Sequence, residues 1–323
     1  MARHNTTDAP IPLTIIGGFL GAGKTTLLNR LLAEGENFAV IVNDFGSINV
    51  DAALIRHQDA ATLQLENGCV CCTLADGFMS ALERVLEMEP PPSALIVEVS
   101  GVGNPWKVAE FAFIEPGLRL SAVVGLVDYS NFLDQLNDKY LSDTVSSQLE
   151  RCDILLLNKT DLVDETKRQD VHRVVKELWP ETRAVNCRHA SIPPELIPVL
   201  GELPAHKSPQ STLNSRSILY DQFSRWTFRS GGRLERTSLE NALDTLPSSV
   251  LRVKGLCWLA TEQRPSIVQM VGRRYSIEMV SESDVNADAT MDTGNVLVLI
   301  GTRDLPDEET LTGHFQAAVQ STG

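Results

Sequence analysis

Long hydrophobic runs are absent from this sequence of 323 residues. Its longest apolar stretches, such as residues 120–127 and 154–157, have the length of one strand, whereas a membrane-spanning helix needs ~18 or more apolar residues. Residues 1–10 are polar and lack the apolar core of a secretory signal. Both absences argue against a membrane protein and predict a cytoplasmic one.

Basic residues are in deficit, because 28 lysines and arginines stand against 42 aspartates and glutamates, which gives a net charge of -14. Such a surface repels the phosphate backbone of nucleic acids, so we expect no nucleic-acid partner. Any phosphate that the protein binds must be held locally, by backbone amides and one or two well-placed cations.

Cysteine and histidine are scarce too, with six of each. Six cysteines in so long a chain do not suggest a disulfide scaffold, and the dispersed histidines form no tract that would store metal. Three of the cysteines, however, crowd into four positions, as Cys69, Cys71 and Cys72. In a reducing compartment this crowding indicates metal binding or redox chemistry.

Short runs rich in valine, isoleucine and leucine alternate with helix-like stretches from residue 11 to about residue 198. Apolar strands separated by helices predict an α/β domain with a mostly parallel sheet that is covered on both faces. The expected strands are residues 13–16, 39–42, 95–99, 122–127 and 154–157, and the expected helices are residues 25–32, 76–88 and 165–178.

The chain exceeds the ~250–300 residues at which a single hydrophobic core usually stops growing, so we expect a second domain. Residues 201–217 mix proline with serine, threonine and asparagine and form the expected linker between a first domain at 11–200 and a smaller α+β domain at 218–320. In the second domain, strands are expected at residues 223–228, 250–259, 267–271 and 296–301, and helices at residues 238–246 and 308–319.

Residues 18–25 read Gly-Phe-Leu-Gly-Ala-Gly-Lys-Thr and fit the eight-position P-loop pattern without a mismatch. They follow an expected strand and open an expected helix, so the fold class is that of a P-loop NTPase. Glycines let the backbone wrap around phosphate oxygens, Lys24 is expected at the β- and γ-phosphates, and Thr25 at Mg²⁺. The alternative is a glycine-rich turn with a chance lysine. The residues expected at the nucleotide phosphates are Gly18, Gly21, Ala22, Gly23, Lys24, Thr25 and Thr26.

The stretch Asn158-Lys159-Thr160-Asp161 follows the expected strand at 154–157 and indicates guanine. A carboxylate such as Asp161 can accept hydrogen bonds from both N1–H and the exocyclic amino group of guanine, whereas adenine offers no such donor pair. Asn158 can bond the opposite edge of the base, and the alkyl stem of Lys159 can lie against its plane. Read alone, the stretch could also be a loop in which Asp161 caps the next helix. With the P-loop upstream, GTP is favoured over ATP.

Two carboxylates stand at the ends of expected strands, Asp44 after the second strand and Glu98 at the end of the strand at 95–99. Ligands of open α/β sheets bind beyond the carboxyl ends of the strands, so these groups can hold Mg²⁺ or position the attacking water. We therefore predict Lys24, Asp44 and Glu98 as catalytic residues and Glu98 as a second magnesium residue beside Thr25. The alternative is that both carboxylates are solvated loop residues. Gly101 could donate its amide to the γ-phosphate.

The three crowded cysteines can present up to three thiolates to one metal ion. Zn²⁺ fits, because it takes thiolates in tetrahedral sites and a fourth position is left for water or another ligand. Co²⁺ and Cu(I) also bind thiolates. Two alternatives are a redox pair, although adjacent cysteines form strained disulfides, and simple burial.

These motifs occur in the order found in the CobW family of P-loop GTPases, which the sequence resembles from about residue 11 to residue 319. Residues 251–258, Leu-Arg-Val-Lys-Gly-Leu-Cys-Trp, look like the C-terminal signature of that family. The resemblance implies a metallochaperone or metallocentre assembly factor that binds a transition metal, often zinc, at the Cys-x-Cys-Cys site and uses GTP to control its transfer. It further implies a metalloprotein client and association of copies through the nucleotide face.

Two residues depart from the family pattern, in which many relatives carry glutamates where this sequence has Asp44 and Ser47. A metal site that needs those glutamates is therefore in question here. Two other functions remain alternatives: a regulatory nucleotide switch with structural or redox-active cysteines, and a P-loop kinase that uses ATP, against which the stretch 158–161 argues. The sequence names neither the physiological metal nor the client.

Overall fold

The computed structural model describes residues 10–33, 37–42, 61–64, 73–193, 196–197, 223–280 and 294–319, with only the backbone described at 61–64 and 73–77. The described residues divide into two compact units. The first unit takes residues 10–180 and 184–197, and the second takes residues 181–183 and those from 223 onward. The predicted linker at 201–217 lies outside the described ranges.

A seven-stranded sheet forms the centre of the first unit, in the strand order β3-β2-β4-β1-β5-β6-β7. Every pairing from β3 to β6 is parallel, so these strands end at one common edge. The strands are β1 (Ile11–Gly18), β2 (Phe38–Val42), β3 (Ala61–Gln64), β4 (Ala94–Glu98), β5 (Leu118–Asp128), β6 (Ile154–Asn158) and β7 (Arg183–Asn186).

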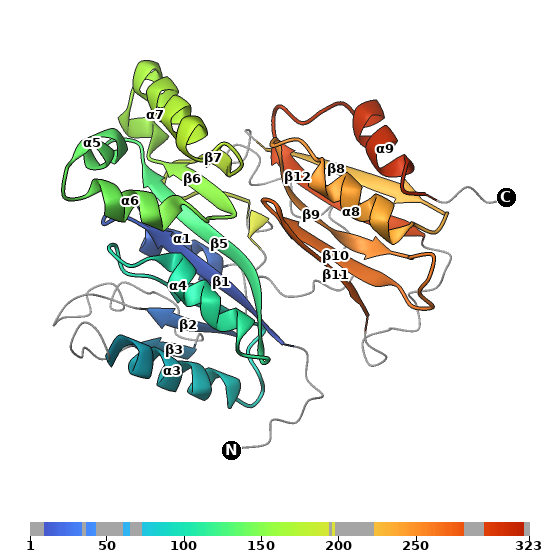
Figure 1. Ribbon diagram of the computed structural model, residues 1–323, viewed down its shortest axis with the longest axis horizontal. Coiled ribbons are helices and arrows are strands. Elements are labelled where there is room, and N and C mark those ends of the chain that lie inside the picture. Colours follow the sequence, from blue (N-terminus) through green and yellow to red (C-terminus); the bar gives the residue numbers. More distant parts are fainter. Residues whose placement is uncertain are drawn as a thin grey trace. The chain divides into compact units, whose positions relative to one another are not determined.

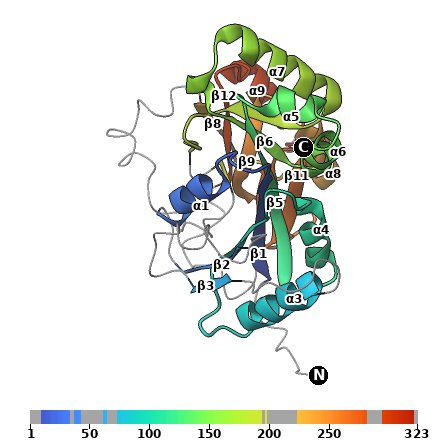
Figure 2. The same ribbon diagram turned by 90° about the vertical axis from the view of Figure 1, so that its left-hand side faces the viewer.

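Helices cover both faces of this sheet, with α1 on one face and α3 and α4 on the other (Figure 2). Strands β2, β4 and β6 are consequently buried along their whole length, which explains their valine, isoleucine and leucine runs. The helices are α1 (Lys24–Leu32), α3 (Thr73–Leu86), α4 (Pro105–Ala109), α5 (Phe132–Asn137), α6 (Ser142–Leu149) and α7 (Glu165–Leu178), with 3₁₀ turns η1 (Glu110–Phe113) and η2 (Thr160–Leu162).

The second unit is built on an antiparallel sheet of five strands, in the order β11-β10-β9-β12-β8. Its core joins strand residues such as Phe228 and Val253 to Leu239 and Phe315 of the two helices, which Figure 1 shows lying on the sheet. The elements are β8 (Phe223–Ser230), α8 (Arg236–Asp244), β9 (Val250–Cys257), β10 (Ser266–Val271), β11 (Arg274–Met279), β12 (Asn295–Thr302) and α9 (Glu308–Gln316).

The predicted fold class is confirmed, since a mostly parallel α/β unit is followed by a smaller α+β unit. All strands and helices expected from the sequence are present, with ends shifted by a few residues. The structure adds β3, β7 and β11 and the short helices α4, α5 and α6, which the sequence did not indicate. Among the helices described, none has the length and apolarity that a membrane crossing requires.

Candidate functional site

The P-loop connects β1 to α1 at the carboxyl edge of the parallel sheet. The backbone N–H of Ala22 donates to the Phe19 carbonyl over 3.2 Å and closes the turn that leads into the helix. Gly23 is the N-cap and has no side chain with which to cap α1. The first amides of the helix can therefore donate to an anion. This is the arrangement that phosphate binding requires.

At two positions of the P-loop, close contacts leave no room for any residue but glycine. Gly18 has φ +133°, and a Cβ there would lie 2.5 Å from the carbonyl oxygen of Leu126. Gly23 has φ +107°, and a Cβ there would lie 2.5 Å from Nδ2 of Asn158. Both the backbone conformation and the space therefore exclude a side chain. Gly21 also has a positive φ, of +75°, but faces open space.

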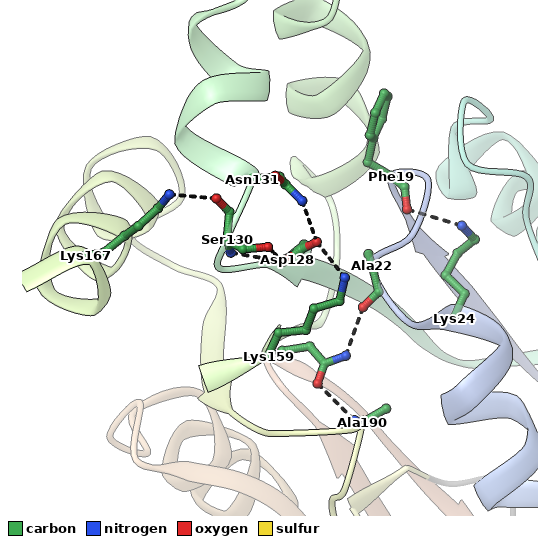
Figure 3. Close-up of polar contacts among 10 residues, drawn as sticks. Phe19, Ala22, Lys24, Asp128, Ser130, Asn131, Lys159, Lys167 and Ala190 are labelled. Carbon is green, nitrogen blue, oxygen red and sulfur yellow. Dashed lines mark hydrogen bonds and ion pairs between the residues drawn. The ribbon is translucent and has the colours of Figure 1, made fainter. Parts of the chain in front are cut away.

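The two polar residues that open α1 take up different positions. Lys24 is buried, and its Nζ donates to the carbonyl of Phe19 at 3.3 Å, as Figure 3 shows. Thr25 Oγ1 donates to Oε1 of Glu98 at 3.0 Å, which brings the end of β4 against the start of α1. Glu98 is only 2% exposed. A hydroxyl and a carboxylate side by side are oxygen donors of the kind that Mg²⁺ takes, so this predicted pair fits the ion.

The segment after β4 packs against the P-loop. A Cβ on Gly101 would lie 2.4 Å from Cδ2 of Leu20, and the Gly101 carbonyl accepts a hydrogen bond from Nε2 of Gln148 on α6 at 2.9 Å. Gln148 is 1% exposed, so this bond is shielded from water. The structure thus brings Gly101 and the P-loop together, as the predicted γ-phosphate contact requires. Thr26, on the outer side of α1, is exposed.

Asn158 is the last residue of β6, and its side chain bonds to two loops instead of being exposed to a ligand. Its Nδ2 donates to the carbonyl of Ala22 at 2.9 Å, and its Oδ1 accepts from the backbone N–H of Ala190 at 2.9 Å. The side chain is 2% exposed. Asn158 therefore ties the P-loop to the loop that follows β7. The predicted contact of Asn158 with the base must use the second hydrogen of the same amide.

The loop after β7 was not predicted as part of the site. Both His189 and Ala190 have φ +51°, the left-handed region, which non-glycine residues rarely adopt. Arg30 of α1 donates from Nε to the carbonyl of His189 at 2.8 Å. The thiol of Cys187 lies 3.5 Å from Oδ1 of Asn158, and burial raises its pKa to about 12. The loop is thus held by α1 and by the end of β6.

Lys159, within the stretch 158–161, forms an ion pair with Asp128. Lys159 has φ +67°, and its Nζ lies 2.7 Å from Oδ2 of Asp128, the last residue of β5. The carboxylate also accepts bonds from the backbone and hydroxyl of Ser130 and from Asn131. Burial alone would raise the pKa of Asp128, but Lys159, Ser130 and Asn131 outweigh it and hold the pKa below its ordinary value.

Asp161 lies in η2 and keeps 34% of its side chain exposed. Its carboxylate lies 4.0 Å from Nε2 of His189, which is itself mostly exposed. Arg168 of α7 fixes the backbone on either side, because its Nη2 donates to the carbonyls of Thr160 at 2.7 Å and Val163 at 3.2 Å. An accessible carboxylate on a fixed backbone is suited to accept hydrogen bonds from a ligand.

Four predicted residues lie outside the described residues: Asp44, Cys69, Cys71 and Cys72, together with the departure at Ser47. Their roles stay predictions. Within the part of the chain that is described, no group of three or more His, Cys, Asp or Glu side chains could hold a metal ion.

The predicted site lacked Asp128, Gln148 and the loop at 187–190. For Asp128 a local signal existed: this acid stands one residue after the expected strand end at 127, with Ser130 and Asn131 two and three residues further on. For the other two no local signal existed, since their partners Gly101 and Asn158 are distant in sequence.

Comparison with known proteins gives two family matches that follow one another along the chain. The family described as CobW/HypB/UreG, nucleotide-binding domain, matches residues 12–186. The cobalamin synthesis protein cobW C-terminal domain matches residues 223–319.

The sequence identity to individual relatives is low. The chain is 28% identical over 312 residues to the zinc-regulated GTPase metalloprotein activator 1 of Dictyostelium discoideum, covering 80% of this chain and 65% of that protein. It is 27% identical over 361 residues to the zinc chaperone CobW of a Sinorhizobium species, covering 99% of this chain and 100% of that protein. Among solved structures, the Zn(II)-bound YjiA GTPase from E. coli matches with 21% identity and a TM-score of 0.45, covering 97% of this chain and 100% of that one.

The first family match spans more than half of the chain and contains the P-loop, Glu98 and the stretch 158–161. The second covers the antiparallel sheet and its helices. The chain belongs to the CobW family of P-loop GTPases.

Proposed function

We propose that this chain is a GTP-hydrolysing metallochaperone that holds a transition metal, zinc by preference, at Cys69, Cys71 and Cys72 and transfers it to a metalloprotein client under the control of GTP. Relatives named as zinc chaperones and as a zinc-regulated GTPase support the metal and the nucleotide together. The cysteine spacing supports thiolate coordination, with a fourth position open for exchange.

The proposed coupling between the nucleotide site and the metal site rests on one row of register partners across the sheet. Ile16, just before the P-loop, is the register partner of Glu98; Glu98 is also the partner of Val42, and Val42 of Gln64. Three steps between strands, at ~4.8 Å each, put Ile16 of β1 and Gln64 of β3 about 14 Å apart. The chain leaves β3 at Gln64 and reaches the first of the three cysteines shortly afterwards.

Glu98 stands in the middle of this row and already bonds Thr25 of the P-loop. Nucleotide binding at the P-loop would reorganise this contact, and β4 and β2 connect it to the end of β3. A shift of Glu98 is therefore a physical route by which GTP could act on the metal-binding segment. Asp44 stands two residues after β2 in sequence, and its predicted catalytic role is part of this proposal.

In hydrolysis, Lys24 would neutralise the charge that develops on the β- and γ-phosphate oxygens, and Asp161 would bind the guanine base. Thr25 and Glu98 would hold Mg²⁺, which supplies Lewis-acid stabilisation of the phosphate oxygens when bound. Glu98 lies at the end of β4, next to the segment where Gly101 contacts the P-loop, and can orient a water for attack. The peptide N–H of Gly101 would donate to the γ-phosphate.

The coupling predicts that zinc changes the dissociation constant of GTP, and that GTP changes that of zinc by the same factor. Coupling between sites is typically ~1–3 kcal/mol, or about 5- to 150-fold in affinity. Fluorescence titration of a GTP analogue with and without zinc, and titration of zinc with and without a non-hydrolysable GTP analogue, measure both halves.

The matched control is Cys257→Ala, which removes a buried thiol of the second unit and should keep the coupling. The triple Cys→Ser variant at positions 69, 71 and 72 should lose it. Equal GTP affinities with and without zinc in the wild-type chain would contradict the proposed equilibrium coupling.

A further inference from the structure

The carboxylate of Asp128 is fully engaged inside the protein. Oδ1 accepts from the backbone N–H of Ser130 at 2.9 Å and from its hydroxyl at 2.6 Å. Oδ2 accepts from Nδ2 of Asn131 at 3.0 Å and from Nζ of Lys159 at 2.7 Å. A carboxylate offers about four lone-pair sites, so none is left for a ligand. The side chain is 3% exposed, and a nucleotide could not reach it.

Asp128 also lies next to other residues of the candidate site. It ends β5 and is the register partner of Asn158 at the end of β6. It follows two residues after Leu126, the register partner of Gly18 of the P-loop. Lys167 of α7 donates to the carbonyl of Ser130 at 2.6 Å and fixes the turn that carries the hydroxyl. Figure 3 shows Ser130, Asn131 and Lys159 around the carboxylate of Asp128, and Lys167 reaching the carbonyl of Ser130.

Lys159 is held at both ends as a result. Its backbone is in the left-handed region, and its ammonium is fixed to Asp128, which leaves the alkyl stem stretched between them with 28% of the side chain exposed. A free lysine would sample many rotamers and would have to be ordered when a base packs on its stem. Ordering such a side chain costs about as much as a tenfold loss in affinity.

We propose that Asp128 is a positioning residue for nucleotide binding, which holds the stem of Lys159 in place as a preformed support for the face of the guanine base. The inference rests on the guanine-binding part of the proposed function and not on the metal. Asp128 acts only through Lys159, because its carboxylate has no free position for the nucleotide. It adds affinity for the base without selecting guanine, which is the role of the exposed Asp161 carboxylate.

The test is a double-mutant cycle on the dissociation constants of GDP and GTP, with Asp128→Asn, Lys159→Met and the double variant. Asp128→Asn should raise both constants about tenfold and leave kcat at saturating GTP within about twofold. In the Lys159→Met background the same change should add less than about twofold, because no ammonium remains to be positioned. Asp134→Asn, which removes an exposed carboxylate on α5, is the matched control and should change neither constant.

Equal losses from Asp128→Asn in both backgrounds would overturn the inference, as would an unchanged dissociation constant in the wild-type background. If the wild-type chain binds no guanine nucleotide, both the proposed function and this inference fail. Should Asp128→Asn fail to fold, Asn131→Ala loosens the carboxylate while its charge remains. That variant is expected to raise the GDP dissociation constant about threefold, and an unchanged value would overturn the inference.

Discussion

Asp161→Asn is expected to weaken GTP binding about 100-fold and to make xanthosine triphosphate the better ligand. The carboxylate can accept from two donors of guanine, and hydrogen bonds to a charged group contribute about 1.5–3 kcal/mol each. An asparagine accepts from N1–H but turns an amino group toward the amino group of guanine. Xanthine carries a carbonyl oxygen at that position, which the asparagine can satisfy. Competition binding with the two triphosphates measures the switch.

The matched control for this change is Asp170→Asn, which neutralises a carboxylate on α7 that pairs only at the surface with Arg173. It should leave GTP binding unchanged, because exposed ion pairs contribute little. If Asp161→Asn kept the preference of the wild-type chain for GTP, the base would not be bound at η2, and the guanine assignment would be wrong.

Lys24→Met is expected to lower kcat for GTP hydrolysis by about 10²–10³, with a smaller change in nucleotide affinity. Removing one positioned donor aimed at developing charge typically has an effect of this size. Methionine keeps the length of the stem that is buried against the P-loop, so the loss reports the ammonium and not the packing. Single-turnover phosphate release measures the chemical step.

The matched control is Lys176→Met on α7. It removes the charge of an exposed lysine that is far from the P-loop in sequence. Its hydrolysis rate should match that of the wild-type chain. A Lys24→Met variant that hydrolysed GTP at the wild-type rate would exclude the P-loop as the catalytic centre.

The fold and the phosphate loop could be predicted because their signals are local. Gly18 and Gly23 are required by positive φ angles, and strands such as β4 and β6 are apolar because both faces are covered. β11 was not predicted because Arg274–Met279 mixes charged and apolar residues and, among the described strands, pairs only with β10 at the edge of the sheet. The helices α5 and α6 are short, with too few turns to show a clear period.

The contacts around the proposed base site could not be predicted, because they join residues that are distant in sequence. Asn158 was expected at the base, yet its amide joins Ala22 to Ala190, pairings that only the sheet order creates. Asp128 follows the strand expected at residues 122–127, and the polar residues after it give a local signal, but its pairing with Lys159 appears only when β5 and β6 lie side by side. Non-local geometry of this kind leaves no pattern in a single sequence.

The measurement that tests the central claim most directly is metal-stimulated GTP hydrolysis by the wild-type chain and by the triple variant Cys69→Ser, Cys71→Ser and Cys72→Ser. Zinc, cobalt and nickel are compared at a fixed Mg²⁺ concentration. We predict that one ion, zinc by preference, changes the hydrolysis rate of the wild-type chain and has no effect on the triple variant. Hydrolysis that is indifferent to every metal and to the three cysteines would contradict the account and favour a nucleotide switch without a metal cargo.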